Sequence, residues 1–149
     1  MNYIITTNLG HLKIFQIEKD INQTTPTLRV VEEKIFPEAH SHYDDLVTDQ
    51  AGRFPVSDGS NSGAMSIGQE NDFELEMKRR LIDQIVIKIE SFLQTHPQAH
   101  WGLAASAPID KLVVERLSPI YKATLQKNLE KDLTKLPPRE ILVSFKKGN

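Results

Sequence analysis

The sequence reads WGLAASAP at residues 101–108. Its first five residues are apolar or small, which is typical of a short buried strand that packs closely against helices. Ala107 and Pro108 then begin a helix, because proline suits the first helical turn. A buried strand that leads directly into a helix indicates an α/β protein.

A long helix is predicted before this strand, at about 72–94. Asn71 and Glu74 form a capping-box pattern at its start. Apolar residues then recur at intervals of three and four, so one face of the helix is expected to pack on the core. These residues are Leu81, Ile82, Ile85, Ile89, Phe92 and Leu93.

The helix that follows the strand is expected to direct Leu112, Val113 and Leu117 toward the core. Proline at the first helical position marks two further helices. The remaining predicted elements are a helix from residue 118, a strand at about 123–129 and a terminal helix from residue 137.

The first forty residues favour strands, because β-branched and aromatic residues suit a pleated, half-buried surface. Asn8 and Gly10 are expected to adopt the positive φ of a hairpin turn, and Phe15 lies off the alternation of the strand that follows. Strands that come first and helices interleaved later predict a single α/β domain over residues 1–149, with a mixed sheet and flanking helices.

Residues 38–71 form a contrasting segment. They are rich in Ser, Asp, Asn, Gly and Gln, show no hydrophobic periodicity, and contain Gly52, Gly59, Gly63 and Gly68. A connection of this length is functional or disordered in most proteins. The sequence therefore predicts a long Gly/Ser/Asp-rich loop at about 38–71.

Composition excludes several classes of protein. The chain has 149 residues, no cysteine and a net charge of -2, so disulfide scaffolds, thiol catalysis and wholesale coating of nucleic acid are not expected. The apolar runs are too short for a membrane helix, which predicts a cytoplasmic protein without a membrane partner. Residues 1–74 carry 5 basic and 12 acidic side chains, whereas residues 75–149 carry 13 and 8, which hints at a basic face.

Most catalytic motifs are absent from the sequence. Gly63 and Gly68 have the spacing of a phosphate-binding loop but lack its lysine. The metal-like cluster of His40, His42 and the adjacent Asp44-Asp45 meets no spacing rule for a metal site. Neither a metal nor another cofactor is predicted.

Basic residues are frequent after position 120. Contact with phosphate backbones would use Lys122, Lys127, Lys131 and Lys135. Acidic neighbours interrupt this series and aromatic residues are sparse, so ordinary solvated helix faces are the favoured interpretation of these lysines.

Three blocks resemble the bacterial host attachment protein family. Residues 8–15 (NLGHLKIF) look like its early hairpin, residues 45–53 (DLVTDQAGR) resemble its Leu-Val-Ser-Asp-Arg-Pro-Gly-Arg block, and residues 131–137 (KDLTKLP) are similar to its closing Lys-Asp-Leu-Thr segment. The resemblance spans nearly the whole chain. It implies a role in attachment to host cells.

That family is in turn similar to the middle domain of archaeal and eukaryotic peptide-chain release factors. The resemblance implies a mixed sheet of ribonuclease-H-like or ribosomal-protein-like form. Release factors place a Gly-Gly-Gln loop before a long helix, and this sequence places Gly68-Gln69 there, with one glycine instead of two. Gln69 is thus the candidate catalytic residue, and the enzyme it would imply is a hydrolase of peptidyl-tRNA, although a non-catalytic protein is favoured.

The resemblance also marks Asp49, Gly52 and Arg53 as candidate anion-binding residues, together with Gly68. Arg53 can fork onto a phosphate or a carboxylate while Asp49 holds it in place. Equally, Asp49 and Arg53 can pair with each other and pin the loop. Two functions follow: a translation-associated module that binds ribosome or tRNA without releasing peptide, and a cytoplasmic factor for host attachment that acts through a protein partner.

Overall fold

The computed structural model of the chain describes residues 1–19, 21–22, 25–39 and 60–147, and within 60–71 it describes the backbone only. In these residues five strands form one sheet: β1 (Tyr3–Thr7), β2 (His11–Glu18), β3 (Thr27–Ile35), β4 (Trp101–Ala105) and β5 (Leu125–Leu129). Their order is β3-β2-β1-β4-β5. β2 is antiparallel to β1 and β3, whereas β4 and β5 run parallel to β1.

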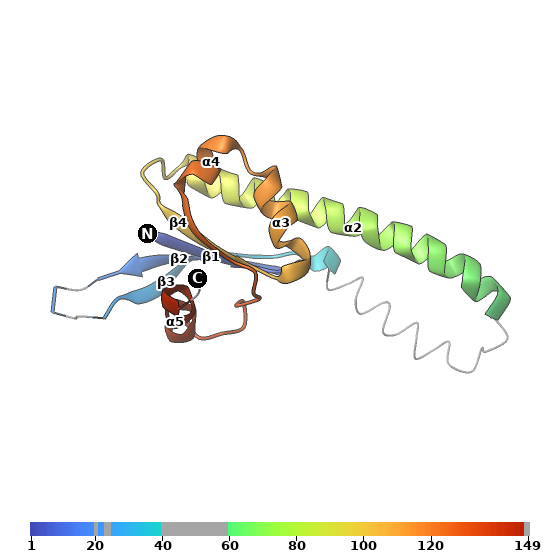
Figure 1. The fold of residues 1–149 in the computed structure, drawn as a ribbon, viewed down its shortest axis with the longest axis horizontal. Coiled ribbons are helices and arrows are strands. Elements are labelled where there is room, and N and C mark those ends of the chain that lie inside the picture. The colour runs from blue at the N-terminus through green and yellow to red at the C-terminus, as the bar shows by residue number, and fades with distance from the viewer. Residues whose placement is uncertain (20, 23–24, 40–59, 148–149) are drawn as a thin grey trace.

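Helices cover both faces of the sheet (Figure 1). The long α2 (Ser60–Gln94) lies on one face with α3 (Ala107–Arg116) and α4 (Pro119–Thr124), and α5 (Pro138–Lys147) lies on the other. The predicted single α/β domain with a mixed sheet and flanking helices is confirmed. The further likeness to the middle domain of release factors stays a prediction.

The sheet buries apolar side chains on both faces, because successive residues of a strand point in opposite directions. Ile5 and Ile14 belong to the core on the side of α2, whereas Ile4 and Phe15 belong to the core on the side of α5. Phe15 was predicted to lie off the alternation of its strand. Its ring is buried in the cluster that contains Ile141 and Phe145 of α5. An apolar residue fits this position because helices cover both faces of the sheet.

The core side of α2 agrees with the predicted apolar stripe, since all six predicted residues are buried. The predicted start of the helix is wrong: α2 begins at Ser60, so Asn71 lies inside the helix and the segment 60–71 is helical and not part of a loop. Once a helix is nucleated, each added residue costs little, and 60–71 contains no proline to stop it. The N-terminal half of α2 projects beyond the sheet (Figure 1).

The turn between β1 and β2 also differs from expectation. No described glycine or other residue has a positive φ, so the left-handed conformation predicted for Asn8 and Gly10 is wrong. The side chain of Asn8 provides the turn's hydrogen bond instead: its Oδ1 accepts from the backbone N–H of Gly10 at 2.8 Å. An Asx turn of this kind closes the chain without the strained backbone.

Leu112 lies outside the core, contrary to the prediction, and is 36% exposed. The buried positions of α3 are Ile109 and Val113, followed by Leu117 just after the helix. These three residues are spaced by four and therefore share one face of the helix. Leu112 lies to one side of that face.

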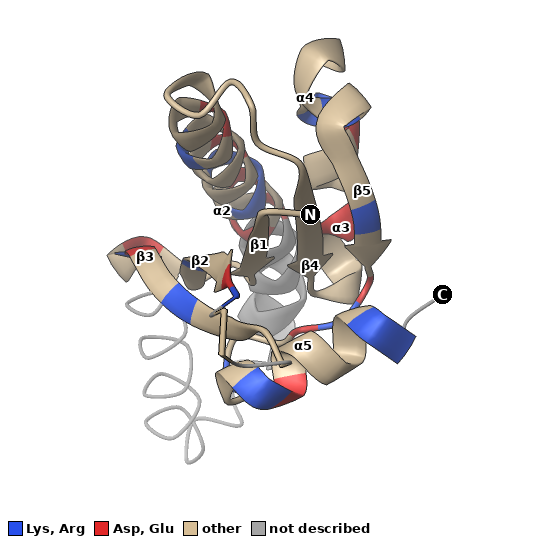
Figure 2. Ribbon diagram, turned by 90° about the vertical axis from the view of Figure 1, so that its left-hand side faces the viewer, with Lys and Arg blue, Asp and Glu red and all other residues tan. Residues whose placement is uncertain are grey.

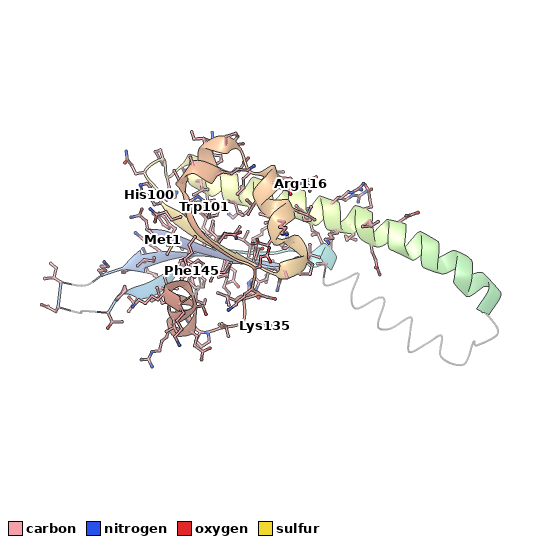
Figure 3. All side chains as sticks on the ribbon, viewed as in Figure 1. Met1, His100, Trp101, Arg116, Lys135 and Phe145 are labelled. Atoms are coloured by element: carbon pink, nitrogen blue, oxygen red, sulfur yellow. The ribbon has the colours of Figure 1, made fainter. Side chains whose placement is uncertain are left out.

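Gly102 lets β4 and α5 approach closely. A Cβ atom at Gly102 would lie 2.7 Å from Cε1 of Phe145 and 2.6 Å from Sδ of Met1. Figure 3 shows Met1 and Phe145 on the same side of the sheet, the side that α5 covers. The glycine therefore makes room for the Phe145 ring, which anchors α5.

Candidate functional site

The structure gives no side-chain geometry for the residues that the sequence singled out as a loop site. Asp49, Gly52 and Arg53 lie outside the described residues, as does the His40-to-Asp45 cluster. Gly68 and Gln69 lie in α2, where the backbone is helical and their side chains are not described. In the part of the chain that the structure describes, no three His, Cys, Asp or Glu residues are placed to hold a metal ion.

The predicted phosphate-contacting lysines separate into different places. Lys122 lies on α4 and donates to the carbonyl of Glu115 at 3.3 Å. Lys127 lies on β5 and donates to the carbonyl of Phe145. Lys131 and Lys135 are exposed in the connection between β5 and α5, where Figure 3 places Lys135 below the sheet. The four lysines thus lie on three different parts of the fold: α4, β5 and the connection that follows β5.

Two of them do meet at an open groove, which we call the β5–α5 groove. It has a volume of about 910 Å³ and is lined by residues 126–131 and by Val143, Ser144 and Lys147 of α5. Lys127 and Lys131 therefore share this groove with Lys147, and among the described residues that line it Glu130 is the one carboxylate. The balance of these charges is positive, which favours an anionic ligand.

One wall of the groove is a sheet edge. β5 is the last strand in the order and pairs with β4, and Figure 2 shows the C-terminal turn of α5 near the carboxyl end of β5. An edge strand presents N–H and C=O groups that a further strand can pair with. The hydrogen bond from Lys127 to Phe145 holds α5 beside this edge.

Polar side chains also gather at the carboxyl ends of the parallel strands. Asn8, just after β1, donates through Nδ2 to Oδ2 of Asp132 at 3.0 Å and to Oγ1 of Thr134 at 3.1 Å. Asp132 also accepts from the backbone N–H of Thr134 at 3.0 Å and from its hydroxyl at 2.6 Å. Two of the blocks that resemble the family, 8–15 and 131–137, are thus joined by hydrogen bonds.

These hydrogen bonds control the pKa of Asp132. Desolvation by burial acts to raise it, but the hydrogen bonds from Thr134 and Asn8, together with the charge of Lys135, outweigh burial and lower the pKa below its ordinary value. The carboxylate is thus ionised and accepts hydrogen bonds from Asn8 and Thr134. Its hydrogen bond with Asn8 connects the end of β1 to the segment that follows β5.

Asp110 lies nearby in the first turn of α3 and is 1% exposed. Its pKa is raised because burial removes water from the carboxylate, and the charge of Glu130 adds to this effect. The side-chain amide of Asn128 donates to Asp110 at 2.7 Å and opposes the rise. The pair joins β5 to α3 behind the β5–α5 groove.

The local contact between Asp132 and Thr134 could be predicted from the sequence. An aspartate two residues before a threonine can form a local turn, and the bond from the Thr134 N–H to Asp132 is of that type. The contact of Asn8 with Asp132 spans 124 positions and has no local signal. Lys147 joins the groove only because α5 folds back beside β5.

We expect the Asp132→Asn variant to lose about 1 kcal/mol of stability at neutral pH, because an amide replaces a charged acceptor of several hydrogen bonds and solvent screens part of the effect. The lowered pKa means that the wild-type contribution is present above the ordinary aspartate pKa and is lost as pH falls through the folded value. Urea titrations at about pH 7 and about pH 3 measure both quantities. Exposed Asp72, changed to asparagine, is the control; an equal pH dependence in wild type and Asp132→Asn would contradict the assignment.

Comparison with known families gives one match. A family model described as "Protein required for attachment to host cells" matches residues 3–143, which is almost the whole chain. No curated protein matches it. Within the described residues, no helix combines the length and apolar character required to cross a bilayer.

Proposed function

The chain belongs to the family of proteins required for attachment to host cells, and from that premise we propose that it supports attachment by binding a partner protein in the β5–α5 groove. The family match is the observation that carries the attachment role, and the charge of the groove supports its place in the proposal. It agrees with the resemblance found in the sequence. The relationship to release factors, with ribosome or tRNA as partner, stays a prediction.

The structure favours a binding role for this groove in two ways. Its lining gathers Lys127, Lys131 and Lys147 around a sheet edge, which supplies charge and backbone hydrogen-bonding groups together. The nearby carboxylates are engaged internally: Asp132 accepts from Asn8 and Thr134, and Asp110 accepts from Asn128. The groove thus binds its partner through complementary charge and backbone hydrogen bonds.

Attachment assays test this proposal. Cells that lack the protein are complemented with wild type or with a groove variant that carries Lys131→Glu and Lys147→Glu. We expect the groove variant to restore attachment roughly tenfold less well, because two charges on the rim now repel an acidic partner. Immunoblots and thermal unfolding show whether the variant is present and folded.

The matched control carries the same change in charge elsewhere. Lys34 lies on β3, at the opposite edge of the sheet, and Lys111 lies on α3; both are exposed. A Lys34→Glu and Lys111→Glu variant is expected to restore attachment within twofold of wild type, since its substitutions lie away from the groove. Equal loss in both variants would attribute the effect to net charge and refute the role of the groove.

A further inference from the structure

We propose that the β5–α5 groove binds an extended, acidic segment of its partner as a sixth strand beside β5. This inference rests on the proposed function and specifies the partner's chemistry. A protein segment in extended form can add to a sheet edge through main-chain hydrogen bonds, while side-chain pockets select its sequence.

The two edges of the sheet differ in how they are occupied. Three of the four charged residues of β3 are paired within the molecule: Arg29 with Glu18, Glu32 with Lys88 and Glu33 with His11. The fourth, Lys34, is exposed. At the β5 edge Lys131 and Glu130 are exposed, and the groove lies alongside the strand. The β5 edge therefore differs from the β3 edge in having a positively charged groove beside it.

The geometry of β5 limits the length of the added strand. The register between β4 and β5 shifts after Trp101, so that Gly102 is paired with Lys127 and Ala104 with Leu129. The regular part of the edge is thus Lys127–Leu129, and the groove continues along residues 130–131. Four or five residues of a ligand strand would span about 13–17 Å of this edge.

The charges of the groove select an acidic ligand. Lys131 and Lys147 stand at the groove, and Lys127 is fixed there by its hydrogen bond to the Phe145 carbonyl. Val143, which is 42% exposed, provides an apolar surface on α5. Because alternate residues of a strand share one face, a segment with acidic residues at every second position directs all of them toward the lysines of this wall.

The test uses a fluorescent decapeptide of alternating Glu and Val, with the full-length protein and fluorescence anisotropy. The same peptide with every backbone nitrogen methylated keeps its charge but has no amide N–H left to donate to β5. We expect methylation to weaken binding at least tenfold, and the Lys131→Glu and Lys147→Glu variant to weaken it by a similar factor. The Lys34→Glu and Lys111→Glu variant should bind within twofold of wild type.

Hydrogen exchange provides a second measurement. On adding the unmethylated peptide, those amides of residues 127–130 that face away from β4 should exchange more slowly, because the added strand accepts their hydrogen bonds. Unchanged exchange at these amides, or equal binding of the methylated peptide, would refute strand addition. A decamer of single-stranded RNA that binds the groove while the acidic peptide does not would also refute it and would favour the nucleic-acid prediction.

The two proposals fail separately. If the groove variant loses attachment while the peptide does not bind, the groove remains the partner site and the strand mode is overturned. If the peptide binds with the expected sensitivity to methylation while the groove variant attaches normally, the strand site stands and the proposed function is overturned.

Discussion

Trp101→Ala should lower the free energy of unfolding by about 4 kcal/mol, the largest single effect expected in this protein. The Trp101 side chain is 0% exposed. Its Nε1–H donates to the carbonyl of Tyr121 and to Oγ1 of Thr124, each at 3.2 Å. Alanine would leave a large cavity and withdraw the donor from both acceptors.

The position of Trp101 explains why the loss should be felt across the fold. It opens β4, where it is paired with Tyr3 of β1 and with Leu125 of β5, and its indole hydrogen bonds reach α4. Figure 3 shows Trp101 beside the layer of helices that covers this face. The residue thus joins three strands and a helix.

Urea unfolding followed by far-UV circular dichroism measures this effect, because Trp101 is the only tryptophan and its removal abolishes that fluorescence signal. Trp101→Phe separates packing from hydrogen bonding and should cost about 1–2 kcal/mol. Ile87→Ala, at a site that is 66% exposed on α2, should cost less than about 0.5 kcal/mol. A loss below about 1 kcal/mol for Trp101→Ala would contradict the packing described above.

Phe145→Ala should cost about 3–4 kcal/mol, because the ring is 3% exposed and fills the space opposite Gly102. Ile141 and Phe145 are the buried residues of α5, so the helix depends on this pair for its attachment to the sheet. Loss of the ring should therefore loosen α5 and, with it, one wall of the β5–α5 groove.

Two measurements distinguish local from global effects of Phe145→Ala. Urea unfolding gives the total loss, and hydrogen exchange should show the amides of α5 opening more readily than those of β1. Val143→Ala is the control on the same helix and should cost less than about 1 kcal/mol, since Val143 is 42% exposed. Similar losses for the two variants would show that α5 is not anchored through Phe145.

Much of the fold could be predicted because its signals are local. The stripe from Leu81 to Leu93, the strand at 101–105 and the prolines that open α3 and α4 all act within a few residues. The beginning of α2 at Ser60 could not be predicted in this way. Its first two turns contain Gly63 and only two apolar side chains, the adjacent Ala64 and Met65, so the helix has no amphipathic pattern there to detect.

The candidate site was predicted only in part, because its residues meet through tertiary structure. Lys127 and Lys131 were recognised as basic, but their grouping with Lys147 depends on α5 returning to the edge strand. Lys122 had the same sequence signal and lies on another element. Spacing along the chain does not distinguish lysines that line a groove from lysines that face solvent elsewhere.

The unequal lengths of α2 and the sheet have a mechanical consequence. At 35 residues, α2 is about 50 Å long, whereas a five-residue strand spans about 17 Å. Among the residues of α2 whose side chains the structure describes, the fully buried ones begin at Leu81, and roughly 30 Å of helix precedes Leu81. Over this length, a tilt of α2 by about 5° about Leu81 corresponds to a displacement of nearly 3 Å at the Ser60 backbone, so the direction of the helix at the sheet sets where its first turn lies.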